Sequence, residues 1–270
     1  MNNKYAQLFI MFFVLFLAQT SLFAQTDKIW DPEKDAVLDG KSILKANLTG
    51  LALRNYGFYA ERILNKRISL VLGVNKMPEG TIPYLNKFID PESFDDIEGI
   101  SDIRISSFSI APEMRFYLSR SGFGKGFYVA PYYKFEHFGA SNYHIEFIDE
   151  NNINQEIKLN GNLNTHSFGA AIGAQWLLGK RKNIALDWLI IGAHYGGNKG
   201  HFDGESTYVL SENDQIEAKK IIEDNLNGVK IGNLVPIRIE NLEINAREAQ
   251  VDISSPWAFI RTAISVGFRF

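Results

Sequence analysis

The chain has 270 residues, a formal net charge of −3 and no cysteine, and 46% of its residues are hydrophobic. The lack of cysteine excludes a disulfide framework, and the near-neutral charge argues against nucleic acid as a partner. After residue 24 no apolar run approaches the roughly 20 residues of a transmembrane helix, so a helical membrane protein is excluded.

The first residues have the layout of a secretory signal peptide. Lys4 gives a positive start, residues 8–18 form an unbroken apolar run, and small residues precede Gln25. The run is well short of the roughly 20 residues that a membrane anchor needs. We therefore expect a signal peptide at 1–24, a polar periplasmic lead-in at 25–40 and one domain at 41–270.

Apolar and polar residues alternate with a period of two in eight segments after residue 40. This alternation predicts β-strands with two different faces. In the clearest segment, Ile110, Met114 and Phe116 alternate with Glu113 and Arg115. The eight segments are 42–53, 56–63, 68–75, 107–118, 126–137, 167–178, 184–195 and 257–270.

The connections between these segments differ in length. Apart from the tight first one near Arg54, three are short, at 64–67, 119–125 and 179–183, and together carry seven Lys or Arg, to which no role is assigned. Three are long, at about 76–104, 137–165 and 196–256. Short turns at one end and long loops at the other are typical of outer-membrane barrels. We therefore expect an eight-stranded antiparallel up-and-down transmembrane β-barrel with long extracellular loops and one short loop helix.

The alternation permits two arrangements of the faces. A soluble barrel of the lipocalin kind places its apolar face inward, whereas a membrane barrel places it outward. The polar face consists mostly of small residues and isolated charges, which suits a narrow filled interior. Aromatic residues such as Phe116 and Phe127 near strand ends suit interfacial girdles. These features favour the membrane arrangement, and Pro112 and Pro131 predict local bulges.

Nine charged residues on the polar faces are candidates for the interior, five positive and four negative. Charges removed from water need partners, so their balance predicts a salt-bridged plug, with unpaired groups in a hydrated interior as the alternative. Glu113 and Arg115 share one face with Lys134 and Glu136 of the neighbouring strand, so cross-strand pairs can form between the two groups. The nine residues are Lys45, Glu61, Glu113, Arg115, Lys134, Glu136, Asp187, Arg261 and Arg269.

Motifs for phosphate, dinucleotide, zinc-protease or serine-hydrolase chemistry are absent from the sequence. His137, His166 and His194 would approach one another at the strand ends, but their spacing matches no metal-ligand pattern, and ordinary rim histidines are the preferred interpretation. We expect no metal, no cofactor and no enzymatic activity. The weaker alternative is an outer-leaflet lipid-modifying enzyme that uses His137 with Ser141, or His166 with Ser167.

Two further segments stand out between the strands. The acidic segment 88–102 is interpreted as a solvated loop, because it lacks the ordered spacing of a calcium loop. Ser211 and Asp214 can start a helix at 211–227, and Gly228 suits its C-terminal end. The apolar stripe of this helix is ragged, so a packed loop helix is preferred to a docking patch or a plug.

Three stretches also resemble a known family: PEMRFYL at 112–118, GFYVAPYYKF at 126–135 and WAFIRTAISVGFRF at 257–270. They resemble small outer-membrane β-barrels of Gram-negative bacteria, of OmpA/OmpX-type architecture, whose function is unknown. The resemblance implies an outer-membrane barrel over about 41–270 and supplies no catalytic residues.

The last strand resembles the signal read by the outer-membrane assembly machinery. Ile264, Val266, Phe268 and Phe270 stand at alternate positions, and such a strand can be captured by pairing at its edge. The expected partners are therefore this machinery and outer-membrane lipids, with an unknown surface partner through the loops. We expect a monomer with a structural or surface-interaction role, and a narrow channel for small solutes as the alternative.

Overall fold

The computed structural model describes residues 41–81, 103–119, 122–148, 154–206, 208–228, 230–231, 235–236 and 238–270. All of them belong to one compact unit, Asp39–Phe270. The expected signal peptide, the lead-in and the acidic segment 88–102 lie outside the described residues. Within the described part of the chain, no helix combines the length and the apolar character needed to cross a membrane.

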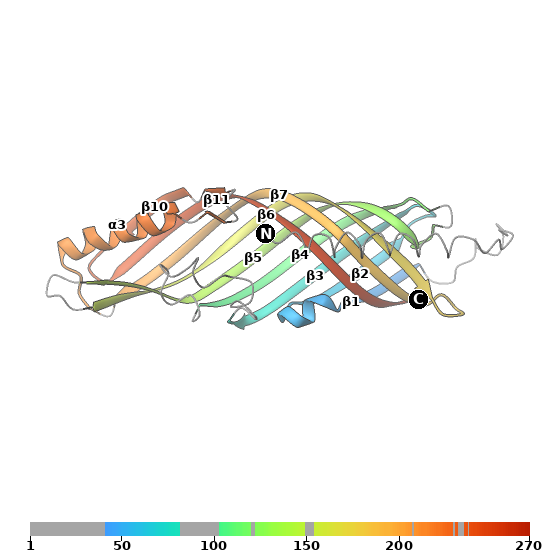
Figure 1. Ribbon diagram of the computed structural model, residues 1–270, viewed down its shortest axis with the longest axis horizontal. Coiled ribbons are helices and arrows are strands. Elements are labelled where there is room, and N and C mark those ends of the chain that lie inside the picture. Colours follow the sequence, from blue (N-terminus) through green and yellow to red (C-terminus); the bar gives the residue numbers. More distant parts are fainter. Residues whose placement is uncertain are drawn as a thin grey trace, which may run out of the picture. The chain divides into compact units, whose positions relative to one another are not determined.

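Eight antiparallel strands close into a ring (Figure 1). Successive strands pair along the sequence up to β7, which pairs with β11, and β1 pairs with β11 to complete the ring. This order confirms the predicted all-β, antiparallel up-and-down arrangement. The strands are β1 (Ser42–Asn47), β2 (Tyr56–Ile63), β3 (Ile68–Gly80), β4 (Arg104–Tyr117), β5 (Gly126–Ile148), β6 (Asn154–Leu178), β7 (Ile184–Ser206) and β11 (Glu248–Arg269).

The remaining elements lie outside the ring order. The short 3-10 helix η2 (Thr49–Leu53) joins β1 to β2, and the left-handed Arg54, with φ of 57°, ends it. The helix α3 (Glu212–Gly228) and a two-stranded sheet of β8 (Lys230–Ile231) and β9 (Val235–Pro236) follow β7. Strand β10 (Arg238–Ile244) then pairs with β11 beyond the part that β1 reaches.

The strands are longer than the alternation predicts. β5, β6, β7 and β11 have 23, 25, 23 and 22 residues. The expected loop at 137–165 is therefore wrong for most of its length, and the one at 196–256 is wrong at both ends. In stretches such as KLNGNLN at 158–164 the period of two persists, but the polar residues face outward and Leu159 and Leu163 face inward, so the band's pattern of an apolar outside and a charged inside does not continue. We call these strand continuations, with β10 and α3, the outer extension.

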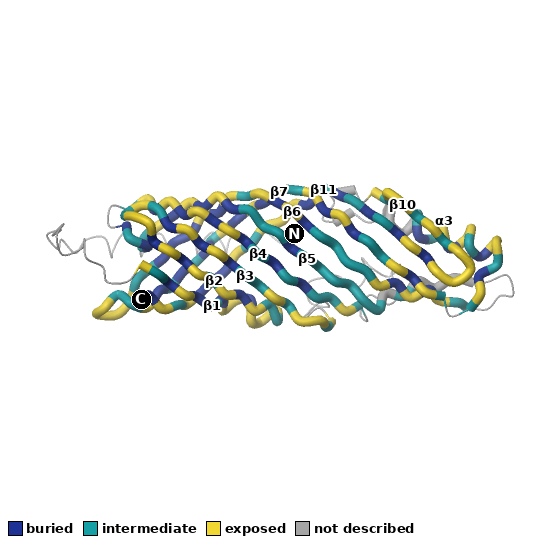
Figure 2. The backbone as a smooth tube through the Cα atoms, turned by 180° about the vertical axis from the view of Figure 1, so that it is seen from behind, coloured by how far each residue is buried: buried dark blue, intermediate teal, exposed yellow. Residues whose placement is uncertain are grey.

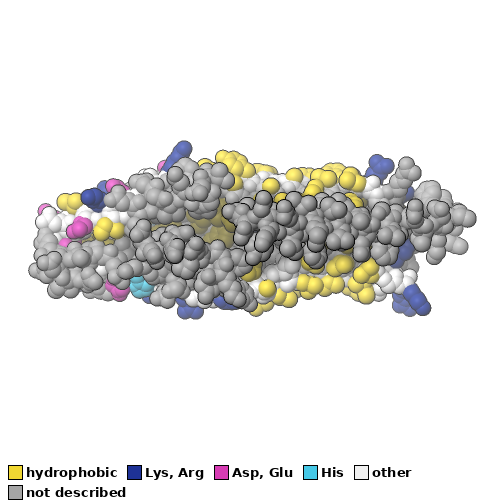
Figure 3. Space-filling view, viewed as in Figure 1, with side chains coloured by type: hydrophobic (Ala, Val, Ile, Leu, Met, Phe, Trp, Pro, Cys, Tyr) yellow, Lys and Arg dark blue, Asp and Glu magenta, His cyan; other side chains and the backbone are white. Residues whose placement is uncertain are grey.

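The faces of the ring are inverted relative to a soluble barrel. On β4, Glu113 and Arg115 are buried in the interior, whereas Met114 and Phe116 between and beside them are exposed. The same alternation runs along the strands near the short turns (Figure 2). Hydrophobic side chains gather over this part of the ring in the space-filling view (Figure 3). We call this surface the apolar band.

Neither proline of the apolar band lies at a bulge. The register of β4 with β5 is the same on either side of them, with Ile110 opposite Phe135 and Phe116 opposite Val129. The bulges predicted at Pro112 and Pro131 are therefore wrong. A proline removes one donor from the ladder, and the pairing continues past it because the neighbouring residues keep the register.

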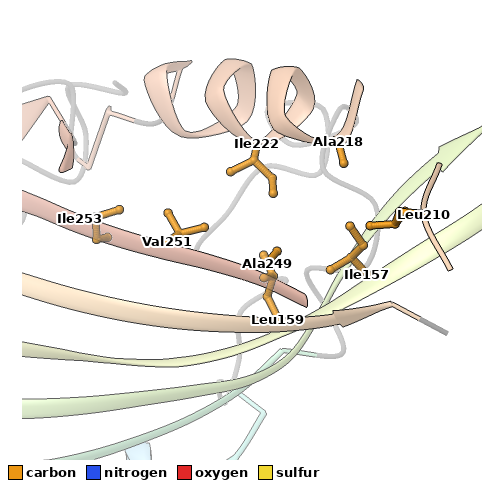
Figure 4. Close-up of a cluster of buried hydrophobic side chains, with 8 residues drawn as sticks. All are labelled: Ile157, Leu159, Leu210, Ala218, Ile222, Ala249, Val251 and Ile253. Carbon is orange, nitrogen blue, oxygen red and sulfur yellow. The ribbon is translucent and has the colours of Figure 1, made fainter. Parts of the chain in front are cut away.

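The helix α3 starts where the sequence predicts. The backbone N–H of Ser211 donates to Asp214 Oδ2 at 3.0 Å, and the N–H of Asp214 donates to Ser211 Oγ at 3.2 Å, which forms a reciprocal cap. Ala218 and Ile222 of the helix pack on inward-facing residues of β6 and β11 in the outer extension (Figure 4). The helix therefore covers the inner side of this sheet.

Candidate functional site

The interior of the ring near the short turns holds a network of charged side chains, which is the candidate site. Lys45 of β1 is its most connected cation. Its Nζ donates to Glu61 Oε2 at 2.7 Å, to Gln175 Oε1 at 2.8 Å and to Asp187 Oδ2 at 2.6 Å. Lys45 is 3% exposed. All three donors of the ammonium group are thus used, and they link strands from different parts of the ring.

Arg115 of β4 is the second buried cation. Its guanidinium donates to Asp187 Oδ2 at 2.6 Å and to Glu113 Oε1 at 2.9 Å. The same group lies over the ring of Tyr128, 4.2 Å from the centroid. Cation and aromatic ring attract each other in this geometry. Arg115 therefore connects two carboxylates to an aromatic side chain.

Arg261 of β11 continues the network away from the turns. It forms an ion pair with Glu113 and lies 3.7 Å from the ring centroid of Tyr132. Glu113 therefore lies between Arg115 and Arg261, with one oxygen to each. The cations Lys45, Arg115 and Arg261 balance the anions Glu61, Glu113 and Asp187. A balanced, hydrogen-bonded set is the condition under which buried charges are tolerated.

Neutral side chains complete the network, and sequence reasoning had assigned them no role. Ser69 and Tyr117 donate hydroxyl hydrogen bonds to Glu61 Oε1 at 2.6 and 2.7 Å. Tyr128 donates to Asp187 Oδ1 at 2.9 Å. The sequence does indicate this role, because these tyrosines occupy inward positions of their strands. Their hydroxyl groups therefore lie beside the charged side chains of the interior.

Glycines on the inner faces make room for these tyrosines. A Cβ atom added at Gly173 would lie 2.4 Å from the hydroxyl oxygen of Tyr128. One added at Gly169 would lie 2.8 Å from the ring of Tyr132. Large aromatic side chains therefore fit into the narrow ring because the strands opposite them carry no side chain at these points.

Of the three other predicted interior charges, Arg269 lies close enough to the network for its charge to interact with Glu61. Lys134 and Glu136 form a separate pair at 2.6 Å. Arg269 is buried on β11. Pairs between these two groups on neighbouring strands were expected, but Glu113 bonds to Arg115 and Lys134 to Glu136, in each case two residues apart on one strand. Residues two apart in a strand share a face, which permits these contacts.

One apolar cluster borders the network beside the short turns, and a second lies farther along the ring, beyond buried polar residues such as His194 and Asn198. Ile43, Ile63 and Ala185 form a buried cluster beside the short turns. The second cluster lies beneath α3 in the outer extension. Its buried members are Ile157, Leu159, Leu210, Ala218, Ile222, Ala249, Val251 and Ile253 (Figure 4). The charged network thus lies between two regions of packed hydrophobic side chains.

The three rim histidines have separate partners. His194 is buried in the interior, with its Nδ1 2.9 Å from the hydroxyl of Tyr132. His166 lies 2.6 Å from the hydroxyl of Tyr133, and His137 lies 2.8 Å from Asn164 Oδ1. Among the residues that the structure describes, no group of three His, Asp or Glu side chains could hold a metal ion.

The serines of the two serine–histidine pairs named as the weaker enzymatic alternative have other hydrogen-bond partners. The Ser141 hydroxyl donates to Glu79 Oε1 at 2.8 Å, and the Ser167 hydroxyl donates to the carbonyl of Lys134 at 3.3 Å. A serine nucleophile requires its base within hydrogen-bond reach. These hydroxyls therefore lack the geometry of an activated nucleophile.

The residues of the expected assembly signal share the outer face of β11. Ile264, Val266, Phe268 and Phe270 are all exposed, between 38% and 55%. The inward residues between them are Ser265, Gly267 and Arg269, of which Ser265 and Arg269 are buried. This places the aromatic and aliphatic side chains on the apolar band. Their recognition by the outer-membrane assembly machinery stays a prediction.

Comparisons with known proteins leave the family open. No protein-family model matches the chain, and no curated protein matches it. Among solved structures, Acinetobacter baumannii CarO2 is similar with a TM-score of 0.32 and 12% sequence identity, over 86% of this chain and 98% of that one. A similarity at this score carries no argument about fold or function. The resemblance to a family of small outer-membrane barrels stays a prediction.

Proposed function

We propose that this chain is an outer-membrane β-barrel with a filled interior, which serves as a rigid anchor for its outer extension. The observation that carries the proposal is the inversion of the faces. Large hydrophobic side chains such as Phe168, Phe58 and Ile260 are more than 60% exposed, while Lys45 and Asp187 are buried. Soluble monomers rarely expose apolar patches larger than a few hundred Å². A lipid environment removes this cost.

The dimensions of the apolar band agree with a membrane. On β6 the outward hydrophobic row runs from Phe168 to Leu178, and on β5 from Phe127 to Phe135. A transmembrane strand needs about 9–11 residues. A closed ring also satisfies backbone hydrogen bonds without a free edge, which the bilayer core demands. The expected export signal at 1–24 supports the outer membrane as the location.

The packing of the interior favours an anchor over a channel. Lys45, Glu61, Arg115 and Asp187 fill the ring near the turns with direct contacts. An eight-stranded barrel has an interior just wide enough for side chains. A continuous water path would have to break these pairs. A surface-interaction role then belongs to the outer extension, whose strands continue well past the apolar band.

Refolding and conductance together test this proposal. The mature chain, refolded in phosphatidylcholine vesicles, is expected to resist extraction at high pH and to migrate differently on gels before and after heating. In planar bilayers it is expected to give no stable single-channel steps. Failure to enter the vesicles would contradict the membrane assignment. Regular conductance steps would instead contradict the filled interior and favour the channel.

A further inference from the structure

The short turns at one end of the ring carry a concentration of basic side chains that the barrel fold does not require. No Asp or Glu occurs in the three turns at 64–67, 119–125 and 179–183. Several of these basic side chains are visible beside the hydrophobic surface in Figure 3. The described members, which we call the basic collar, are Lys41, Arg62, Lys66, Arg67, Lys125, Lys180, Arg181 and Lys182.

The opposite end of the molecule has a different charge pattern. Exposed carboxylates are frequent in the outer extension, and they include Glu205, Glu217, Glu240, Glu243 and Glu248. The excess of basic side chains at the collar is therefore a charge difference between the two ends of the molecule. A formal net charge of −3 for the whole chain cannot account for it.

The collar begins where the apolar band ends. Leu178 and Ile184 flank the turn that carries Lys180 and Arg181, and both hydrophobic side chains are more than 40% exposed. Two residues of extended chain span about 7 Å. The polar headgroup layer on each side of a bilayer is about 5–8 Å thick. With the band in the hydrocarbon core, these cations lie at the depth of lipid phosphates.

Backbone hydrogen bonds hold the turns in place. The N–H of Phe123 donates to the carbonyl of Lys66 at 2.8 Å, which ties the β4–β5 turn to the β2–β3 turn. The amide of Gln175 donates to the carbonyl of Gly124 at 2.7 Å and fixes the same turn to the interior network. The third turn is closed by a bond from the N–H of Lys182 to the carbonyl of Gly179 at 3.1 Å. The backbone positions that carry these side chains are therefore fixed, which lowers the ordering entropy that binding costs.

From the charge, depth and fixed geometry of the collar we propose that it binds the phosphates of anionic phospholipids in the leaflet at the turn end. The inference rests on the proposed membrane insertion and adds a lipid class and a side. The guanidinium and ammonium groups supply charge-assisted hydrogen bonds to phosphate oxygens. Because Lys41, Arg62, Arg67, Lys180 and Arg181 are exposed, the interaction weakens with salt.

Spin-labelled lipids test the proposal. Wild-type protein in phosphatidylcholine vesicles is expected to enrich spin-labelled phosphatidylglycerol over spin-labelled phosphatidylcholine at its surface at low salt. The variant R67Q/K180Q/R181Q is expected to reduce this preference at least fivefold, since one basic side chain near an anionic surface contributes about that factor. The matched control K158Q/R238Q/R247Q removes the same charge from exposed sites in the outer extension and is expected to retain the preference.

The outcomes separate the two proposals. An inserted wild-type protein without preference, or a preference that survives in R67Q/K180Q/R181Q, overturns the lipid site while the barrel assignment stands. A preference lost only in K158Q/R238Q/R247Q also overturns it, because the binding would then lie at the other end. A protein that does not insert into the vesicles overturns both proposals. Heat-dependent gel migration of each variant reports its folding.

Discussion

At the scale of single residues, the interior depends on cations that each serve several carboxylates. Lys45 reaches Glu61 and Asp187, and Arg115 reaches Asp187 and Glu113. Removal of one partner from a buried ion pair leaves a charge without compensation, which costs more than the pair contributes. The network therefore makes stability sensitive to single substitutions inside the ring.

Lys45→Met tests this sensitivity. The substitution keeps most of the side-chain volume but leaves Glu61 and Asp187 with less positive charge, and the expected loss is about 3–5 kcal/mol in the free energy of unfolding. Urea unfolding of the refolded protein in lipid vesicles measures it. Lys134→Met is the control, because Lys134 pairs with Glu136 alone and is less buried. Equal losses for both variants would contradict the role of Lys45.

His201 gives a pH-dependent test outside the apolar band. Its Nδ1 lies 2.6 Å from Asp252 Oδ1 and its Nε2 lies 3.1 Å from Asp203 Oδ1. The hydrogen bond to Asp252 raises the pKa of His201 above its usual range. The stabilisation is therefore present below the unfolded pKa of about 6.5 and is lost as the pH rises through the folded pKa. Solvent screening keeps this contribution small.

An NMR titration of the His201 ring measures the shift. The pKa in the wild type is expected above the usual histidine range, and Asp252→Asn is expected to lower it more than Asp203→Asn does, because Asp252 makes the larger contribution. A wild-type value at or below the usual range would show that these hydrogen bonds are absent in solution.

At the scale of elements, α3 is the part of the outer extension that depends most clearly on a few side chains. Ile222 is 1% exposed and packs in the cluster beneath the helix, whereas Ile216 is 68% exposed. The sequence predicted the start of the helix through Ser211 and Asp214, since a cap is local. It could not predict the buried face, because the apolar stripe is short and the sheet beneath it is formed by distant residues.

Ile222→Ala tests whether packing holds the helix. Loss of a buried isoleucine side chain is expected to cost about 2–5 kcal/mol in the local stability of α3. Hydrogen exchange of the α3 amides is expected to accelerate while the amides of β2 and β3 keep their protection. Ile216→Ala, at an exposed position of the same helix, is expected to leave exchange unchanged. Similar acceleration in both variants would contradict the packing role of Ile222.

At the scale of the whole molecule, much of the ring was predictable because its strands have two chemically different faces. Positions such as Glu113 and Arg115 alternate with Met114 and Phe116, so a period of two identifies both the strand and its inner side. The outer extension was not predicted because its strands lack the apolar outer face of the band, with polar residues such as Lys158 and Asp203 exposed on the outside and an apolar cluster on the inside. The contacts of the network could not be predicted from the sequence either, because Gln175 contacts Lys45 only once the ring has closed.

That closure has a consequence for the order in which the protein folds. Lys45 and Asp187 are 142 residues apart in the chain, and β1 finds β11 only after all the strands between them exist. Before two distant residues can form a contact, the chain between them must lose conformational entropy. This cost precedes the stabilising contact and slows folding. The hairpins can form early and locally, but the ions meet only in the last step. Folding of the ring should therefore be slow, and its rate should be limited by the pairing of β1 with β11.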